Sequence, residues 1–249
     1  MNKKLIKISS VAAFIFFMVL IGGVAHAATP ACGSTITENT TLDADMTCPA
    51  TNGINISANN IVLDCAGHSI TGSGSGYGIY LSGNNSVIKN CKISGFQNGV
   101  YLDYASGNTI SNVTANSNTG NPGSGGSSGG PSSGIYLNSS SNNTISGVTA
   151  NSNTGGYGSA YSGSGGPGSG IYLNSSSNNT ISSVTANSNT GGAASYFGIG
   201  GPGSGIYLNL SSNNTISGVT ANSNTGGTGF YGGSGGPGSG IYLNSSSNN

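Results

Sequence analysis

The sequence predicts an all-β fold: a right-handed parallel β-helix, or solenoid, built from coils of about 21 residues with Gly-rich side loops. The first observation behind this prediction is a tripeptide, Ile-Tyr-Leu or Val-Tyr-Leu, that recurs at spacings of 21, 35, 36, 35 and 35 residues. The second is a series of Gly-, Ser- and Pro-rich inserts whose removal returns each longer unit to about 21 residues. The tripeptides begin at Ile79, Val100, Ile135, Ile171, Ile206 and Ile241, and the inserts span residues 120–133, 155–169, 191–204 and 226–239.

Residues 134–153 illustrate one unit. Its segments Ile-Tyr-Leu, Thr-Ile-Ser and Val-Thr-Ala alternate inward and outward positions with period two, as strands do, and Asn, Ser and Gly between them suit tight corners. Stacked units can bury the few apolar side chains that one unit cannot bury alone. A left-handed solenoid is the structural alternative, but its six-residue period is absent. We expect inward positions at Ile135, Leu137, Ile145, Val148 and Ala150, and an internal amide ladder at Asn153 and its equivalents.

The unit also resembles a known group of proteins. The pattern Gly-Ile-Tyr-Leu-x-x-Ser-x-Asn-Asn-Thr-Ile-Ser is similar to the parallel β-helix repeat of the pectate-lyase-like superfamily, particularly of the NosD-like β-helix proteins. The resemblance covers about residues 54–249, and residues 60–72 look like the first coil of many exported members. It implies the fold strongly. It implies little about function, because the superfamily includes lyases, hydrolases, epimerases and adhesins.

The N-terminal segment is typical of export. Three lysines precede an apolar run from Val11 to Val24, and Ala25-His26-Ala27 suits signal peptidase, so residues 1–27 are predicted to be a signal peptide. A retained anchor is the alternative, although the run is short for a membrane span. We expect residues 28–53 to form an N-terminal cap and residues 54–249 the β-helix, truncated at its C-terminus because the sequence stops within a unit. The predicted location is secreted, periplasmic or at the cell surface.

An even number of cysteines in an exported chain favours disulfides. We prefer the pairs Cys32–Cys48, local to the cap, and Cys65–Cys91, whose separation is close to one coil, while the two other connectivities stay open. A metal cluster is the rival interpretation. It is disfavoured because the spacing lacks Cys-x-x-Cys and the chain after residue 27 has a single histidine, His68.

Charge limits the possible functions. After residue 27 the chain has two lysines, no arginine and five acidic residues, a net charge of −3, and residues 104–249 carry no charged side chain. Nucleic-acid binding therefore lacks its usual basic surface. Acidic-sugar lyases need a base, usually Arg or Lys, and glycoside hydrolases need two carboxyl groups across a cleft. We predict no catalytic residue, no metal site and no cofactor; Asp64, beside a turn, is expected to support that turn or to pair with Lys89.

Aromatic residues are the most suggestive feature for binding. The middle residue of each tripeptide should point outward, so that the stacked coils present one exterior column of tyrosines. Its rings are candidates for stacking on sugar faces, and the alternative is that they only stabilise the sheet. A second aromatic set lies within the inserts and either presents exposed tips for binding or packs against the solenoid. The candidate ligand-binding residues are Tyr80, Tyr101, Tyr136, Tyr172, Tyr207 and Tyr242.

These observations favour an exported, non-catalytic scaffold of the cell surface or secreted fraction, with polysaccharide or cell-surface glycan as the candidate partner. Two alternatives stay open. One is a fragment of a carbohydrate-active enzyme, a polysaccharide lyase or glycoside hydrolase, whose catalytic coils are missing. The other is an adhesin-like structural protein. No nucleic acid is expected as a partner, no membrane association is expected after signal cleavage, and the oligomeric state is undetermined.

Overall fold

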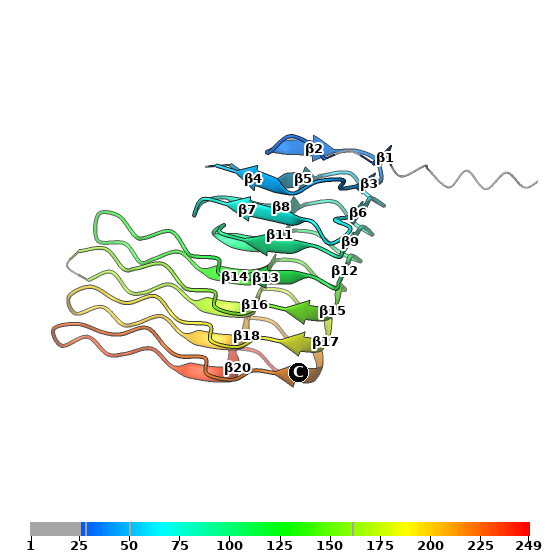
Figure 1. The fold of residues 1–249 in the computed structure, drawn as a ribbon. Helices are drawn as coiled ribbons and strands as arrows, with labels where there is room; N and C mark the ends of the chain where they lie inside the picture. The colour runs from blue at the N-terminus through cyan, green and yellow to red at the C-terminus, as the bar shows by residue number, and fades with distance from the viewer. Residues whose placement is uncertain (1–25, 28, 50, 161) are drawn as a thin grey trace, which may run out of the picture.

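The computed structural model describes residues 26–27, 29–49, 51–160 and 162–249, and within these ranges every regular element is a β-strand. The strands form coils that stack in one column, with the N-terminal coil at the top of Figure 1 and the C-terminal coil at the bottom. Of the predicted signal peptide, residues 1–25 lie outside the described residues. Its last two residues form strand β1 (His26–Ala27), which pairs with β3 (Thr40–Thr41).

One face of the column is an eight-stranded parallel sheet with one strand from each coil. Val100 pairs with Ile79 and with Ile135, and the later tripeptides continue in the same register. The prediction that these segments lie side by side in one continuous sheet is confirmed. In order, the strands are β2 (Ser34–Ile36), β5 (Ile54–Ile56), β8 (Tyr77–Leu81), β11 (Asn98–Asp103), β14 (Ser132–Asn138), β16 (Gly168–Asn174), β18 (Gly203–Asn209) and β20 (Gly238–Asn244).

The rest of the wall is a twelve-stranded sheet. Its upper coils contain two rows of short strands, and β15 (Thr144–Thr149) pairs with both rows because Ile145 lies beside Ile110 and Thr149 beside Thr114. Strands β17 (Thr180–Thr185) and β19 (Thr215–Thr220) continue below β15. The first row is β3, β6 (Val62–Asp64), β9 (Val87–Lys89) and β12 (Thr109–Ser111), and the second is β4 (Met46–Cys48), β7 (Ser69–Gly72), β10 (Lys92–Ser94) and β13 (Thr114–Asn116).

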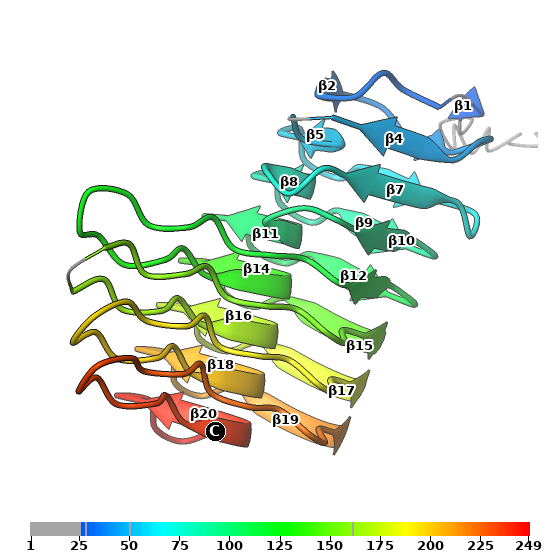
Figure 2. The same ribbon diagram turned by 60° about the vertical axis from the view of Figure 1, so that its left-hand side comes forward.

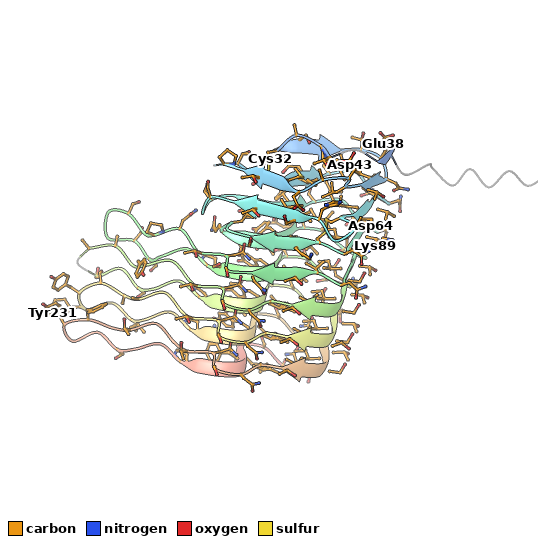
Figure 3. The ribbon with its side chains drawn as sticks, in the orientation of Figure 1. Cys32, Glu38, Asp43, Asp64, Lys89 and Tyr231 are labelled. Atoms are coloured by element: carbon orange, nitrogen blue, oxygen red, sulfur yellow. A yellow bond between two sulfur atoms is a disulfide. The ribbon has the colours of Figure 1, made fainter. Side chains whose placement is uncertain are left out.

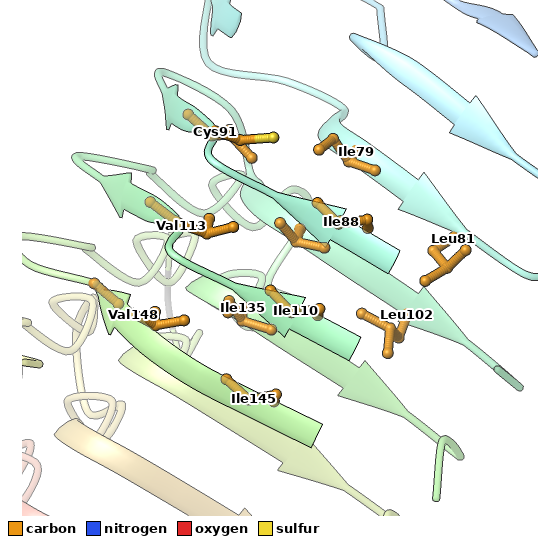
Figure 4. Close-up of a cluster of buried hydrophobic side chains, with 14 of the residues drawn as sticks. Ile79, Leu81, Ile88, Cys91, Leu102, Ile110, Val113, Ile135, Ile145 and Val148 are labelled. Carbon is orange, nitrogen blue, oxygen red and sulfur yellow. The ribbon is translucent and has the colours of Figure 1, made fainter. Parts of the chain in front are cut away.

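The space between the sheets is filled by aliphatic side chains from every coil. All five inward positions predicted for the 134–153 unit have at most 1% of their surface exposed. Figure 4 shows Ile110, Ile135 and Ile145 among the side chains in this core. Burying one such side chain contributes about 1.5–3 kcal/mol, so the stacked repeats together supply the dry interior that one coil lacks.

Buried asparagines line the corners of the solenoid as continuous ladders. Asn153 Nδ2 donates to Asn189 Oδ1 at 3.0 Å, and Asn118 Nδ2 donates to Asn153 Oδ1 at 2.9 Å, which confirms the predicted ladder. Each amide of this ladder also accepts a bond from the backbone N–H of the coil before it. A second ladder that was not predicted runs through Asn143 and Asn179, which bond at 3.1 Å. Because the buried amides form hydrogen bonds with one another, burying these polar side chains at the corners costs little free energy.

The segment from residue 29 to residue 49, expected as a cap, contains the first full coil of the column. Its strands β2, β3 and β4 pair in parallel with strands of the next coil.

The two preferred disulfides are both present, Cys32–Cys48 with Cα atoms 5.4 Å apart and Cys65–Cys91 with Cα atoms 4.8 Å apart. The second links neighbouring coils, because β6 ends beside Cys65 and pairs with β9, which precedes Cys91. Disulfides are typical of proteins outside the reducing cytosol.

The Gly-rich inserts project from the same side of each later coil and lie one above another (Figure 1, Figure 2). Each loop has an outgoing arm, which leaves the solenoid, and a returning arm. The N–H of Gly192, in the third outgoing arm, donates to the carbonyl of Gly166 in the second returning arm at 2.8 Å. The N–H of Gly166 in turn donates to Gly156, in its own outgoing arm, at 2.9 Å. Bonds within loops thus alternate with bonds between loops, so the loops form an ordered second layer rather than flexible linkers.

This layer explains the high glycine content of the arms. A Cβ atom on Gly192 would overlap the carbonyl oxygen of Gly156, and one on Gly166 would overlap that of Gly130. The backbones approach so closely that only hydrogen fits between them.

Candidate functional site

The six predicted tyrosines do form one outward column on the eight-stranded sheet. The ring centroids of Tyr136 and Tyr172 are 4.7 Å apart with planes at 10°, and those of Tyr172 and Tyr207 are 4.7 Å apart at 3°. These three side chains are only 7–9% exposed. Their ring faces therefore lie against neighbouring rings and are not free to stack on sugars. The ring contacts match the alternative in which the column stabilises the sheet, and a ligand-binding role for the six residues stays a prediction.

A seventh ring, that of Tyr77 on the same strand as Tyr80, packs beside the N-terminal end of this column. Tyr77 stacks on Tyr101 with centroids 4.3 Å apart, and the Tyr80 hydroxyl donates to Asp103 at 2.9 Å. Burial raises the pKa of Tyr136 to about 12 and also raises the pKa of Tyr101, Tyr172 and Tyr207. These hydroxyls therefore keep their protons at ordinary pH.

The acidic residues are confined to the first coils, where Figure 3 labels Glu38, Asp43 and Asp64. Asp43 accepts a 2.6 Å bond from the Thr29 hydroxyl, which lowers the pKa of Asp43. The pKa of Asp45 is lowered by the backbone N–H of Ser69, which donates to it at 2.7 Å. Both carboxylates thus accept hydrogen bonds from segments that lie 14 and 24 residues away in the sequence.

Asp64 has the turn-supporting role expected for it. Lys89 Nζ lies 3.2 Å from Asp64 Oδ2, and the Asn90 amide and the backbone N–H of Ala66 donate to Oδ1. Burial alone would raise the pKa of Asp64, but these donors outweigh it and the net shift is downward. His68 lies beside Asp45, with Nδ1 3.3 Å from the carboxylate. Within the described residues, no group of three or more His, Cys, Asp or Glu side chains could hold a metal ion.

A groove lies where the outgoing arms leave the solenoid. It has a volume of about 420 Å³ and spans three successive coils. Its lining includes a column of threonines that pair in register, Thr154, Thr190 and Thr225. Gly155 and Tyr157 and residues 191–193 and 226–228 of the next two arms complete the lining. We call it the threonine groove. A smaller depression of about 270 Å³ surrounds Glu38 at the N-terminal end, and Glu38 is the one ionisable residue among those that line it.

The outer ends of the loops carry exposed aromatic rings. Tyr196 and Tyr231 stack with centroids 4.7 Å apart, and Phe197 and Tyr231 are each 72% exposed. Figure 3 places Tyr231 at the far end of the loops, away from the solenoid. The described tip residues are therefore exposed rather than packed against the solenoid flank. Tyr161 lies outside the described residues.

The family follows from a sequence comparison that covers nearly the whole described chain. The model for the right-handed β-helix region matches residues 27–249. The chain belongs to the right-handed β-helix family. No curated protein sequence matches this β-helix protein.

Two solved structures resemble the β-helix protein at low sequence identity. One is pectate lyase Pel9A, with 13% identity and a TM-score of 0.43, covering 80% of this chain and 66% of the lyase. The other is the alginate lyase from Paenibacillus sp. str. FPU-7, with 12% identity and a TM-score of 0.40, covering 87% of this chain and 93% of the lyase. The β-helix protein therefore spans about two thirds of the pectate lyase chain.

Sequence reasoning missed the threonine groove of this β-helix protein. The signal was present, because a threonine stands directly before each Gly-rich insert, at Thr119, Thr154, Thr190 and Thr225. The repeated threonines line a groove only because the loops stack on one another.

Among the described residues, no helix is long and apolar enough to cross a membrane.

Proposed function

We propose that this β-helix protein is an exported, non-catalytic scaffold of the cell surface or secreted fraction, with polysaccharide as its candidate ligand. The observation that carries the proposal is that its aspartates are hydrogen-bonded within the protein and that its later coils have no charged side chains. Asp43, Asp45, Asp64 and Asp103 each accept hydrogen bonds from neighbouring side chains, and residues 104–249 carry no charged side chain. Sugar-bond cleavage by hydrolysis or elimination needs groups that exchange protons with the substrate.

The later coils instead offer repeated neutral groups. Their surface presents threonine and serine hydroxyls, asparagine amides and glycine backbone, repeated once per coil. Such groups form hydrogen bonds with a polyhydroxylated ligand without activating it. The amide ladders and the hydrogen-bonded loop layer hold these groups in fixed positions, which suits a binding scaffold.

Expression of residues 1–249 in a bacterial host tests export. We expect the protein to be recovered outside the cytoplasm with Ala28 as its first residue. Retention of residues 1–27 on a membrane-bound product would contradict this part of the proposal and favour the anchor.

The purified exported protein tests the absence of catalysis. It is incubated with acidic and neutral polysaccharides, and released reducing ends and unsaturated products are measured. We expect no turnover above that of a heat-denatured sample. Release of either product would overturn the scaffold proposal in favour of a carbohydrate-active enzyme.

A further inference from the structure

We propose that the threonine groove binds a chain of neutral polysaccharide that runs along the solenoid axis, across successive coils. This inference rests on the proposed scaffold function and gives it a site. It places the ligand beside the threonines that precede the Gly-rich loops, rather than on the tyrosine column.

The threonine column supplies hydroxyls at a regular interval. Neighbouring coils lie about 4.8 Å apart, and each contributes one threonine to the groove. Thr154 and Thr190 are half-buried and Thr225 is exposed. Thr190 Oγ1 and Thr225 Oγ1 are 3.3 Å apart, so they bond to each other and still keep further donor or acceptor capacity. The column therefore presents a row of hydroxyls to a sugar chain, two of which, those of Thr190 and Thr225, are already bonded to each other.

Tyr157 adds an aromatic surface to the groove. Its side chain is 62% exposed, and none of the ring contacts found among the described residues involves it. Its backbone carbonyl accepts a 2.7 Å bond from Gly123 in the loop before it, so the ring stands on a fixed backbone. A ring with a free face, beside hydroxyls, can stack on the apolar face of a sugar while its own hydroxyl bonds to sugar oxygens.

The walls of the groove are ordered before any ligand arrives. Gly155 N–H donates to the carbonyl of Thr190 at 2.9 Å, and Gly191 N–H donates to that of Thr225 at 2.9 Å. Gly158 N–H donates to the carbonyl of Ala193 at 2.9 Å. Because the arms are bonded to one another, binding orders few additional groups, which lowers its entropic cost.

The chemistry of the lining indicates a neutral ligand. The groove contains threonine, glycine, alanine and tyrosine, and no charged residue occurs in residues 104–249. An acidic polysaccharide would lose hydration of its carboxylates without gaining a cationic partner. The other aromatic surfaces fit less well, because the central rings of the tyrosine column, Tyr136, Tyr172 and Tyr207, are covered and the loop-tip rings line neither the threonine groove nor the depression around Glu38.

The test compares two matched pairs of variants of the exported protein. Thr190→Val removes a groove hydroxyl, and Thr185→Val removes an outward hydroxyl in β17 that does not line the groove. Tyr157→Ala removes the groove ring, and Tyr231→Ala removes an exposed loop-tip ring that does not line it. Binding is measured by affinity gel electrophoresis with neutral β-glucan, xylan and mannan and with acidic polygalacturonate and alginate.

We expect retardation by at least one neutral polysaccharide, with affinity reduced about fivefold or more in each groove variant and within about twofold of wild type in each control. Tyr157→Ala alters an exposed side chain and keeps the test valid if Thr190→Val fails to fold. Binding to none of the neutral polymers, binding to acidic polymers alone, or equal losses in groove and control variants would overturn the groove proposal. These outcomes leave the scaffold proposal intact, since that proposal is tested separately by export and by turnover.

Discussion

Asn138 Nδ2 donates a 2.9 Å hydrogen bond to Asp103 Oδ1 on the outer surface of the eight-stranded sheet. Asn138 Oδ1 accepts from Asn174, and the same bond repeats from Asn209 to Asn174 and from Asn244 to Asn209. Every amide in this column therefore donates toward the N-terminal coils. Asp103, the last charged residue of the chain, stands at the acceptor end of the column, where a carboxylate strengthens the bond it receives.

Asp103→Asn should weaken this column. The carboxylate accepts from both Asn138 and the Tyr80 hydroxyl, and a neutral amide oxygen accepts less strongly. We expect the free energy of unfolding to fall by about 1 kcal/mol. Urea unfolding of Asp103→Asn, Asn138→Ala and the double variant measures the coupling, and strictly additive losses would show that the two residues do not interact.

The loop layer predicts that glycine is required at particular positions. Gly192→Ala should destabilise the protein by about 1–3 kcal/mol, because the new Cβ overlaps a carbonyl of the neighbouring loop. Gly235→Ala is the matched control, since its Cβ would meet nothing closer than 3.5 Å, and it should be neutral or slightly stabilising. Thermal unfolding and amide exchange of residues 155–204 measure both effects. Equal behaviour of the two variants would show that the arms do not pack as closely as described.

Two buried serines with opposite surroundings form a second matched pair. Ser169 Oγ is buried without a hydrogen-bond partner, whereas Ser176 Oγ accepts from the N–H of Ser140 at 2.9 Å and donates to the Asn174 carbonyl at 2.9 Å. We expect Ser169→Ala to raise the unfolding midpoint slightly and Ser176→Ala to cost about 1–3 kcal/mol. A loss of stability in Ser169→Ala would mean that its hydroxyl has a partner in solution.

The tyrosine column predicts a loss of stability in alkali. Burial raises the pKa of Tyr136 from 10.0 to about 12, so the folded protein keeps this proton at a pH where the unfolded chain loses it. The stability contributed by Tyr136 is complete below pH 10 and is lost as the pH rises to about 12, a difference of about 2–3 kcal/mol. Urea midpoints across this range should fall more steeply for wild type than for Tyr136→Phe. Parallel curves would contradict the shift.

Much of the fold could be predicted because each coil repeats the same short pattern of inward, outward and corner residues. Ile135 and Leu137 alternate with Tyr136, and that period of two assigns the inward and outward faces of a strand. Asn153 follows a corner in every unit, so its amide was expected to meet its equivalents. The disulfide Cys65–Cys91 was preferred because its separation of 26 residues is close to one coil.

The candidate site was harder to predict because it depends on distances between coils. The outward direction of Tyr136 follows from its own strand, but its exposure depends on rings contributed by other coils, which cover its faces. Thr154 and Thr225 are two repeats apart, and they line one groove only because the intervening loops stack in register.

The sequence by itself determined the coil, its dry interior, its corner amides and the neutrality of residues 104–249, because these depend on residue type and on a period that every unit repeats. Only the tertiary structure decided that the Gly-rich loops form a hydrogen-bonded layer, that the tyrosine faces are covered and that a groove opens beside Tyr157. The physical reason is that backbone bonds such as Gly192 to Gly166, and the ring stacking between Tyr136 and Tyr172, join different coils, and their geometry exists only once the coils are stacked.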